Sequence, residues 1–332
     1  MSAAFAARPD PAAVPAASVA VHTGDDDLAV AWGVDRRTLF QAASISKPVA
    51  ALAALRLVAQ GMVGLDVDVN EYLTSWRLPG GDGMPPVTLR HLLCHGGAVT
   101  VPSFPGYEAD APLPSLIDIL DGRPPANTPP VRRDGPPGQV HRYSGGGFMV
   151  LQQLLEDVTG RAFAEMVREL VFSPAQMTTA TYGQPAPESV APAFVNSNQV
   201  SWCVYPELAA AGLWCSPTDL VRFARAIQSA IAGEPRALLP QDLARAMVTP
   251  QVPGWGLGLT LAGSPPHRRF SHGGTNYGYT CALIAAVSGS QAVAVMTNSD
   301  AGVPLIASLL AAMHDAIGWP DLPESQGESR PW

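Results

Sequence analysis

The sequence predicts an α/β protein in which both chain ends form one antiparallel sheet flanked by helices, and the middle forms a mostly helical inserted subdomain. Two short strand patterns separated by a Gly-Asp turn occupy residues 17–34. Further short patterns, β-branched or aromatic and interrupted by glycine, follow one another between residues 255 and 299. Helical spacing of apolar residues dominates the segment between them. We therefore expect an α/β subdomain of residues 1–80 and 247–332 and a helical subdomain of residues 81–246.

Helices are indicated by apolar spacing together with start and stop signals. The first follows Ser44, with apolar residues at helical spacing from Val49 to Met62 and Gly61 or Gly64 at its end. The other helix patterns cover residues 87–97, 146–160, 162–172, 216–231 and 304–317. Residues 102–137 contain ten prolines, which predicts a long irregular loop.

Composition excludes several classes of function. Apolar residues make up 47% of the chain and charged residues 14%, so a large core can be buried. The net charge is −8 and no Lys/Arg-rich run occurs, so no nucleic-acid partner is expected. No stretch reaches the roughly 18 apolar residues of a membrane span. Prolines interrupt the N-terminal segment where a signal peptide would be apolar, so we expect a cytoplasmic protein without a membrane partner.

The cysteines and histidines show no metal-ligand spacing. Cys94, Cys203, Cys215 and Cys281 are far apart and form no CxxC pair, which favours free thiols over disulfides in the cytoplasm. The seven histidines form no HExxH or comparable pattern. We expect neither a metal nor a cofactor.

The segment SISK places Ser44 three residues before Lys47, at the start of a long apolar helix. A cation in the first turn opposes the helix dipole, and a buried ammonium group is costly to desolvate. Pro48 is tolerated only in a first turn, so it fixes both residues there. A lysine with a lowered pKa can activate a neighbouring serine hydroxyl. The alternative is a helix-capping serine beside a surface lysine, which this short pattern by itself favours.

Two further groups carry candidate chemistry. Tyr143 precedes three glycines and a helix, where it can serve as a general base or simply pack in a loop closed by C-capping glycines. The tripeptide His-Gly-Gly occurs twice. The copy that starts at His95 ends a short helix, where its glycines are expected to act as C-caps. The copy that starts at His272 lies among the strands, where glycines let a ligand approach the backbone, so we assign function to this copy.

The order SxxK, tyrosine, glycine-rich strand resembles the serine β-lactamase and penicillin-binding protein family, specifically its class C and esterase (transacylase) branch. Pro137-Gly138 before Tyr143 is similar to the PG-x-x-x-Y-S stretch of that family. AAAGLWCSPTDLVRF at residues 209–223 is similar to its GG-L-x-S-T-x-x-D-L element, and FSHGGTNYGY with AVAVMTNSD resembles its closing strands. The likeness runs from about Ser18 to about Leu310 and favours a catalytic Ser44 and Lys47.

The resemblance implies a β-lactamase-like fold with the active site between the two subdomains. Ser44 would be the acyl-accepting nucleophile, Lys47 its proton-shuttling partner and Tyr143 the general base. His272 stands where the family often has the lysine of K-T-G. The implied substrate-binding groups are the backbone N–H groups of Ser44 and Thr275, which would form the oxyanion hole, together with Gly145, Gly273 and Gly274.

Two departures narrow the expected function. Penicillin-active members have Y-x-N where this chain has Gly145, and His272 replaces a fixed positive charge with a group that is mostly neutral near pH 7. We therefore expect a serine hydrolase that cleaves a small ester, lactone or amide through an acyl-enzyme.

Other functions stay open at this point. The main alternative is a transacylase that passes the acyl group to an amine or alcohol in natural-product biosynthesis. A β-lactamase or D,D-peptidase and a non-catalytic binding protein are less favoured. Selectivity is expected in the loop 102–137 and in four aromatic residues, Trp202, Tyr205, Trp255 and Tyr277.

Overall fold

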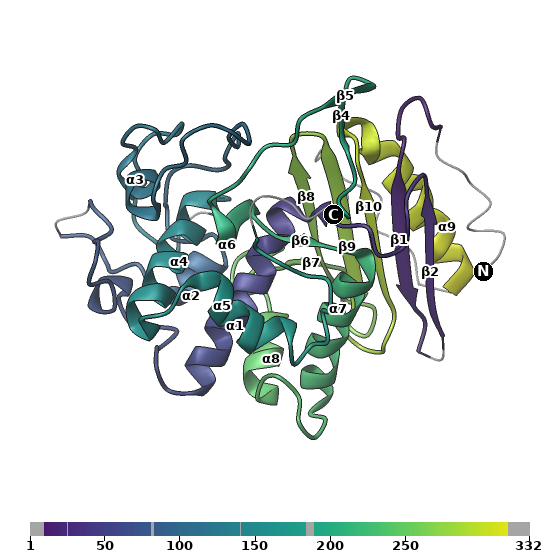
Figure 1. Ribbon diagram of the computed structural model, residues 1–332. Coiled ribbons are helices and arrows are strands. Elements are labelled where there is room, and N and C mark those ends of the chain that lie inside the picture. The colour runs from purple at the N-terminus through teal and green to yellow at the C-terminus, as the bar shows by residue number, and fades with distance from the viewer. Residues whose placement is uncertain (1–9, 25, 81–82, 140, 184–188, 318–332) are drawn as a thin grey trace.

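The computed structural model describes residues 10–24, 26–80, 83–139, 141–183 and 189–317. Six of its strands form one antiparallel sheet in the order β2-β1-β10-β9-β8-β7 (Figure 1). They are β1 (Ala17–His22), β2 (Asp27–Trp32), β7 (Thr260–Ala262), β8 (Arg269–Asn276), β9 (Tyr279–Ala286) and β10 (Ala292–Thr297). Two small pairs complete the strands: β3 (Phe40–Gln41) with β6 (Trp214–Cys215), and β4 (Ala193–Val195) with β5 (Asn198–Val200). Both ends of the chain thus build one sheet, as the sequence predicts.

The central strands β1, β9 and β10 are buried at every position because helices cover both faces of the sheet. On one face, Val19 and Val295 pack with Ile306 of α9 (Val303–Ile317). On the other face, the neighbouring pair Ala20 and Ala294 joins the main core. There α7 (Pro217–Ala232) packs against β1, β9 and β10.

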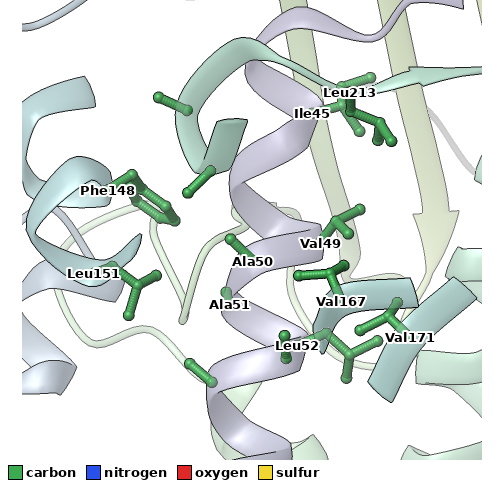
Figure 2. Close-up of a cluster of buried hydrophobic side chains, with 14 of the residues drawn as sticks. Ile45, Val49, Ala50, Ala51, Leu52, Phe148, Leu151, Val167, Val171 and Leu213 are labelled. Atoms are coloured by element: carbon green, nitrogen blue, oxygen red, sulfur yellow. The ribbon is translucent and has the colours of Figure 1, made fainter. Parts of the chain in front are cut away.

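The remaining helices include α4, α5 and α6, which contact α1 (Ser46–Ala59), and others that pack on α4 or α7. They are α2 (Leu89–Leu93), α3 (Leu116–Asp121), α4 (Gly145–Thr159), α5 (Phe163–Val167), which continues as a π-helical turn (Arg168–Phe172), α6 (Leu208–Ala211) and α8 (Gln241–Met247). Figure 2 shows α1 amid side chains of its neighbours, with Phe148 and Leu151 on one side and Val167 on the other. Alanines dominate α1, so these neighbours can pack close to its backbone. The helix that begins just after Ser44 is therefore held by the core.

Helix ends follow the signals in the sequence. Ser216 caps α7 by accepting a hydrogen bond from the Asp219 N–H, and the Asp219 carboxylate accepts one from the N–H of Ser216. Gly160 ends α4 with φ +65°. Gly61, with φ +73°, lies two residues beyond the end of α1.

Three local predictions need correction. The loop 102–137 is not entirely irregular, because α3 lies within it and begins with a capping box formed by Ser115 and Asp118. The first of the strand patterns between residues 255 and 299, WGLGLTLAG at 255–263, forms only the three-residue strand β7. After α2 the left-handed residue is His95, with φ +58°, and not a C-capping glycine.

The division into subdomains 1–80 with 247–332 and 81–246 stays a prediction. A helix of the inserted segment, α7, packs on the sheet itself. No helix within the described parts of the chain is both long and apolar enough to cross a bilayer.

Candidate active site

Ser44 lies on a sharp turn between β3 and α1. Among residues 38–55 it is the only one that is not buried. Ala43 before it has φ +49°, a left-handed conformation that is costly for alanine and that persists only where the surroundings hold it. Ser46 supplies one such restraint: its hydroxyl donates to the Ala43 carbonyl at 2.6 Å and accepts from the Leu213 N–H at 3.0 Å. The fold thus buries residues 38–55 and leaves only the Ser44 side chain partly accessible.

Lys47 is 2% exposed, so the sequence-based alternative of a surface lysine is wrong. Its Nζ lies 3.1 Å from Ser44 Oγ and donates to the Ala210 carbonyl of α6 at 2.9 Å. It also lies 4.9 Å from the centre of the Tyr143 ring. Burial lowers the pKa of Lys47 to about 7. Near neutral pH this amine can therefore both accept and give up a proton beside the serine.

The glycines after Tyr143 begin helix α4 and are not C-caps. Ser144 is the N-cap and accepts a hydrogen bond from the Gly147 N–H at 2.8 Å. The N–H groups of Gly145 and Gly146 donate to the carbonyls of residues 102 and 101. A Cβ at Gly146 would lie only 2.4 Å from a backbone oxygen of the same segment. The glycines let this segment dock against the start of α4, which fixes the place of Tyr143 just before it.

His95 lies in the site next to Tyr143, although its sequence position predicts only the end of a helix. Its ring centre lies 4.4 Å from that of Tyr143, and the side chain is buried. The Ser144 N–H donates to His95 Nδ1 at 3.1 Å, and the Arg142 N–H donates to the His95 carbonyl at 2.8 Å. Burial, and then the neighbouring Lys47, lowers the pKa of His95 well below its usual value. His95 thus binds the chain on both sides of Tyr143, residue 144 through its ring and residue 142 through its backbone carbonyl.

His272 lies on β8 and is also buried, 6.2 Å from Tyr143 between ring centres. Burial, and then Lys47, lowers its pKa to about 3, so the ring is neutral at physiological pH. Its Nδ1 lies 2.6 Å from the carbonyl of Gly273, which can only accept, so Nδ1 carries the proton. Nε2 is then a lone-pair acceptor, and it has no partner among the described residues.

Of the two glycines after His272, Gly274 is closely surrounded by other atoms. A Cβ at Gly274 would lie 2.3 Å from the Ala42 carbonyl oxygen and 2.7 Å from Cys281 Sγ. Gly274 therefore lets β8 approach the turn that carries Ser44. Thr275 is exposed on the same strand.

A cleft of about 430 Å³ joins these groups. It is lined by Ser44, Ser103, Tyr143, Trp255, Thr260, His272, Gly273, Gly274 and Thr275. The sequence-predicted residues Ser44, Tyr143 and His272–Thr275 thus share one cavity, with Lys47 beneath it. No side chain that lines the cleft carries a fixed positive charge, and the described residues form no cluster of metal ligands. These features match acyl transfer to a serine.

Comparison with known proteins decides the family. The family model described as Beta-lactamase matches residues 1–316. The chain belongs to the beta-lactamase family. Esterase EstB of Burkholderia gladioli is 29% identical over 326 residues, which cover 84% of this chain and 82% of EstB. Penicillin-binding protein 4* of Bacillus subtilis is 25% identical, over 88% of this chain and 68% of that protein.

Solved structures agree with this fold. A hydrolase with promiscuous acyltransferase activity, EstCE1, superposes with a TM-score of 0.74 at 20% identity, over 91% of this chain and 94% of its own. The octameric penicillin-binding protein homologue from Pyrococcus abyssi also gives 0.74, at 23% identity over 92% and 74% of the two chains. The predicted β-lactamase-like fold and the prediction of an enzyme are therefore confirmed. The chain is a serine hydrolase of the beta-lactamase family.

The four aromatic residues expected to set selectivity in this family member have different surroundings. Trp255 lines the cleft and contacts the rings of His95, Tyr143 and His272. Trp202 and Tyr277 instead line a second cavity of about 580 Å³, together with Glu108–Asp110 and Val200–Cys203. Tyr205 is buried and accepts a hydrogen bond from the Tyr277 N–H.

Proposed function

We propose that this member of the beta-lactamase family hydrolyses a small neutral ester, lactone or amide through an acyl-enzyme on Ser44. The observation that carries the proposal is Lys47 Nζ, buried and 3.1 Å from Ser44 Oγ, beside Tyr143 in a cleft that opens at the serine. EstB, which is similar over most of the chain, supports an ester substrate.

In the proposed reaction, Tyr143 takes the Ser44 proton as general base, with Lys47 as its proton-shuttling partner, as Oγ bonds to the substrate carbonyl carbon. The negative charge on the carbonyl oxygen is met by the backbone N–H groups of Ser44 and Thr275. The bond to the leaving alcohol or amine then breaks, and the leaving group takes the proton. Water attacks the acyl-serine, releases the carboxylic acid and restores Ser44.

His272 supports a neutral substrate in preference to a β-lactam or a peptide with a terminal carboxylate. The ring lines the cleft and its pKa is lowered to about 3, so at neutral pH it offers no positive charge that would bind a carboxylate. Gly145 offers no side-chain amide to hold an acylamide carbonyl. Small neutral esters should therefore be turned over faster than nitrocefin, and a native preference for nitrocefin would contradict this assignment.

A transacylase is the second candidate, favoured by one observation. Trp202 and Tyr277 line a second cavity of about 580 Å³, and Tyr277 follows the cleft residue Thr275 by two positions in the chain. An amine or alcohol acceptor held in this second cavity would lie near the acyl group. Intact mass after incubation with p-nitrophenyl acetate, with and without small amines or alcohols, separates the two functions. A hydrolase returns to its original mass at a rate independent of the acceptor, whereas a transacylase deacylates faster and forms the amide or ester.

The variant Ser44→Ala tests the nucleophile. We expect loss of the acetyl adduct and a decrease in turnover of roughly 10⁴- to 10⁶-fold, because nucleophile removal typically costs that much. Ser103→Ala is the matched control, since this exposed serine lines the same cleft. Tyr143→Phe and Lys47→Ala should each approach the same loss, and the double variant should be hardly slower. Independent, multiplying losses would show that one of the two only packs.

A further inference from the structure

Helix α6 ends in two carbonyl groups that are bound by side chains from other parts of the chain. The helix has only four residues, Leu208–Ala211, and the last carbonyls of a helix have no partner within it. The Ala210 carbonyl accepts the hydrogen bond from Lys47 Nζ at 2.9 Å. The neighbouring Ala211 carbonyl accepts one from Asn276 Nδ2 at 3.1 Å. One end of α6 therefore binds both the buried amine of the site and a side chain of strand β8.

Asn276 also connects this helix end to the strand that leads into the Ser44 turn. Its Nδ2 donates a second hydrogen bond, to Gln41 Oε1 at 2.7 Å. Gln41 lies in β3, three residues before Ser44, and its Nε2 donates to the Cys203 carbonyl at 2.8 Å. Because a backbone carbonyl can only accept, the carbonyls of Cys203 and Ala211 fix the orientation of both side-chain amides.

Both amides are buried, so water does not replace these hydrogen bonds when one of them is lost. Asn276 is 7% exposed and Gln41 is 2% exposed. A buried polar group that loses its partner costs the free energy of its desolvation. Asn276 is the last residue of β8 and directly follows Thr275, which lines the cleft. Its side chain therefore joins β8 to β3 and to the end of α6, next to the catalytic cleft.

We propose that Asn276 is a positioning residue that holds the end of α6 against Lys47. The inference rests on the proposed acyl-enzyme function, in which Lys47 is the proton-shuttling partner. Asn276 does not line the cleft and acts through the Ala210 carbonyl, which holds the amine 3.1 Å from Ser44 Oγ. A hydrogen bond from a charged amine is stronger than one from a neutral amine, so this carbonyl also favours the protonated form.

The first measurement follows the protonation of Lys47 directly. Lys47 is the only lysine of the chain, so protein that contains lysine labelled with carbon-13 at Cε gives one side-chain resonance. In wild type its titration midpoint should lie near pH 7, because burial lowers the pKa of Lys47 to about 7. In Asn276→Leu, which keeps the size of the side chain without its donor, the midpoint should move to lower pH. The charged form then loses its acceptor while the amine stays buried.

The second measurement is steady-state kinetics with p-nitrophenyl acetate. Asn276→Leu should lose roughly 10²-fold in kcat, because a small displacement of a catalytic group can cost that much. KM should change little, since Asn276 does not line the cleft. Gln41→Met leaves the bond to Ala211 in place and should have a smaller effect on kcat and on the Lys47 midpoint. Asn276→Ser, whose hydroxyl is too short to replace the amide, takes the place of Asn276→Leu if that variant does not fold.

Gln228→Met is the matched control. Gln228 is 6% exposed, and its Nε2 also donates to two backbone carbonyls, those of Ala286 at 2.9 Å and Gln291 at 3.0 Å. Ala286 pairs with the first residue of β8, whereas Asn276 is the last. Gln228→Met should therefore lower Tm about as much as Asn276→Leu does, while kcat and the Lys47 midpoint stay as in wild type.

The outcomes separate positioning from stability. A Lys47 midpoint in Asn276→Leu equal to that of wild type would overturn the proposal even if Tm decreases, because the residue would then only stabilise the fold. An equal shift in Gln228→Met, or a shifted midpoint with unchanged kcat, would overturn it as well. If wild type turns over no ester, the proposed function fails, whereas the titration still decides whether Asn276 positions the amine.

Discussion

The tripeptide His-Gly-Gly occurs at residues 95–97 and again at 272–274, and both copies contact Tyr143 through their histidines. The first copy follows helix α2, and the second lies inside strand β8. In the first copy the histidine does the positioning, because His95 binds the N–H groups of residues 142 and 144. In the second copy the close contact is made by a glycine, since Gly274 abuts the turn before Ser44.

The two histidines also differ in tautomer. His95 Nδ1 accepts from the Ser144 N–H, so Nε2 carries its proton, whereas His272 Nδ1 donates to the Gly273 carbonyl and leaves Nε2 as an acceptor. The same tripeptide thus has a donor at Nε2 in the first copy and an acceptor at Nε2 in the second. The backbone packed against each copy, and not the tripeptide, decides its chemistry.

The largest effect should come from the glycines. Gly274→Ala places a methyl group against the Ala42 carbonyl, and we expect a loss of about 2–3 kcal/mol in the free energy of unfolding, as for other overpacked cores. Turnover should decrease strongly as well, because the turn that carries Ser44 must shift. Gly97→Ala meets methyl groups of Val87 and Val99 at 3.3 Å and a backbone oxygen at an ordinary 3.7 Å, and should cost less than about 1 kcal/mol. Urea unfolding of both variants checks the contrast, and equal losses would contradict it.

For the histidines we expect the larger loss in the first copy, whereas for the glycines it is expected in the second. In His95→Gln the side-chain amide lies near the former Nε2 position and not at Nδ1, so the buried Ser144 N–H loses its acceptor; this costs about 1–3 kcal/mol and should lower kcat by roughly 10²-fold through displacement of Tyr143. KM should change little. His272→Gln should stay within about fivefold of wild type for neutral esters, since a neutral acceptor is retained. Steady-state kinetics with p-nitrophenyl acetate checks the order, and a larger loss for His272→Gln would reverse the assignment.

Acid should destabilise the fold through these same rings. The pKa of His272 is about 3 in the folded protein and 6.5 in the reference state, so the unfolded chain binds the extra proton between these values. Stability is then unaffected above about pH 6.5 and is lost as pH falls, at up to about 1.4 kcal/mol per pH unit. The pKa shift of His95 has the same direction. Urea unfolding from pH 7 to 4 should show a shallower loss in His272→Gln, while the exposed control His267→Gln should follow wild type.

The smallest and most specific observable is the tautomer pair. Nitrogen-15 spectra at pH 7 should show Nδ1 protonated in His272 and Nε2 protonated in His95, assigned with the two glutamine variants. The same spectra should show the His272 ring still neutral at about pH 5, and His95 protonated only well below the usual range of an imidazole. Two rings with the same tautomer would remove the difference between the copies.

Much of this architecture could be predicted because its signals are local. The β-branched or aromatic strand patterns, the Ser216 cap and the Pro48 constraint on the SISK helix act within a few residues, so pattern alone places them. The grouping of Ser44, Tyr143 and His272 came from their order along the chain, which resembles a family. Their shared cleft follows from that fold.

The missed features depend on chain segments that meet only after folding. His95 follows a helix, and nothing near it in the sequence shows that residues 142–144 dock on it. The proline-rich segment 102–137 is predicted as an irregular loop, although it contains helix α3. Helix α3 in that segment did carry a signal, because Ser115 and Asp118 have capping-box spacing.

Lys47 is the only lysine in the sequence, and it is buried against Ser44. Every other cationic side chain apart from histidine is an arginine, which amine-directed reagents do not modify. The rate of Lys47 modification by such a reagent therefore reports how fast the core around α1 opens. The signal comes from one residue, because no other side-chain amine competes. An acyl group on Ser44 should slow that modification if it closes the only path to the amine. Modification of Lys47 thus measures local unfolding at the catalytic centre itself.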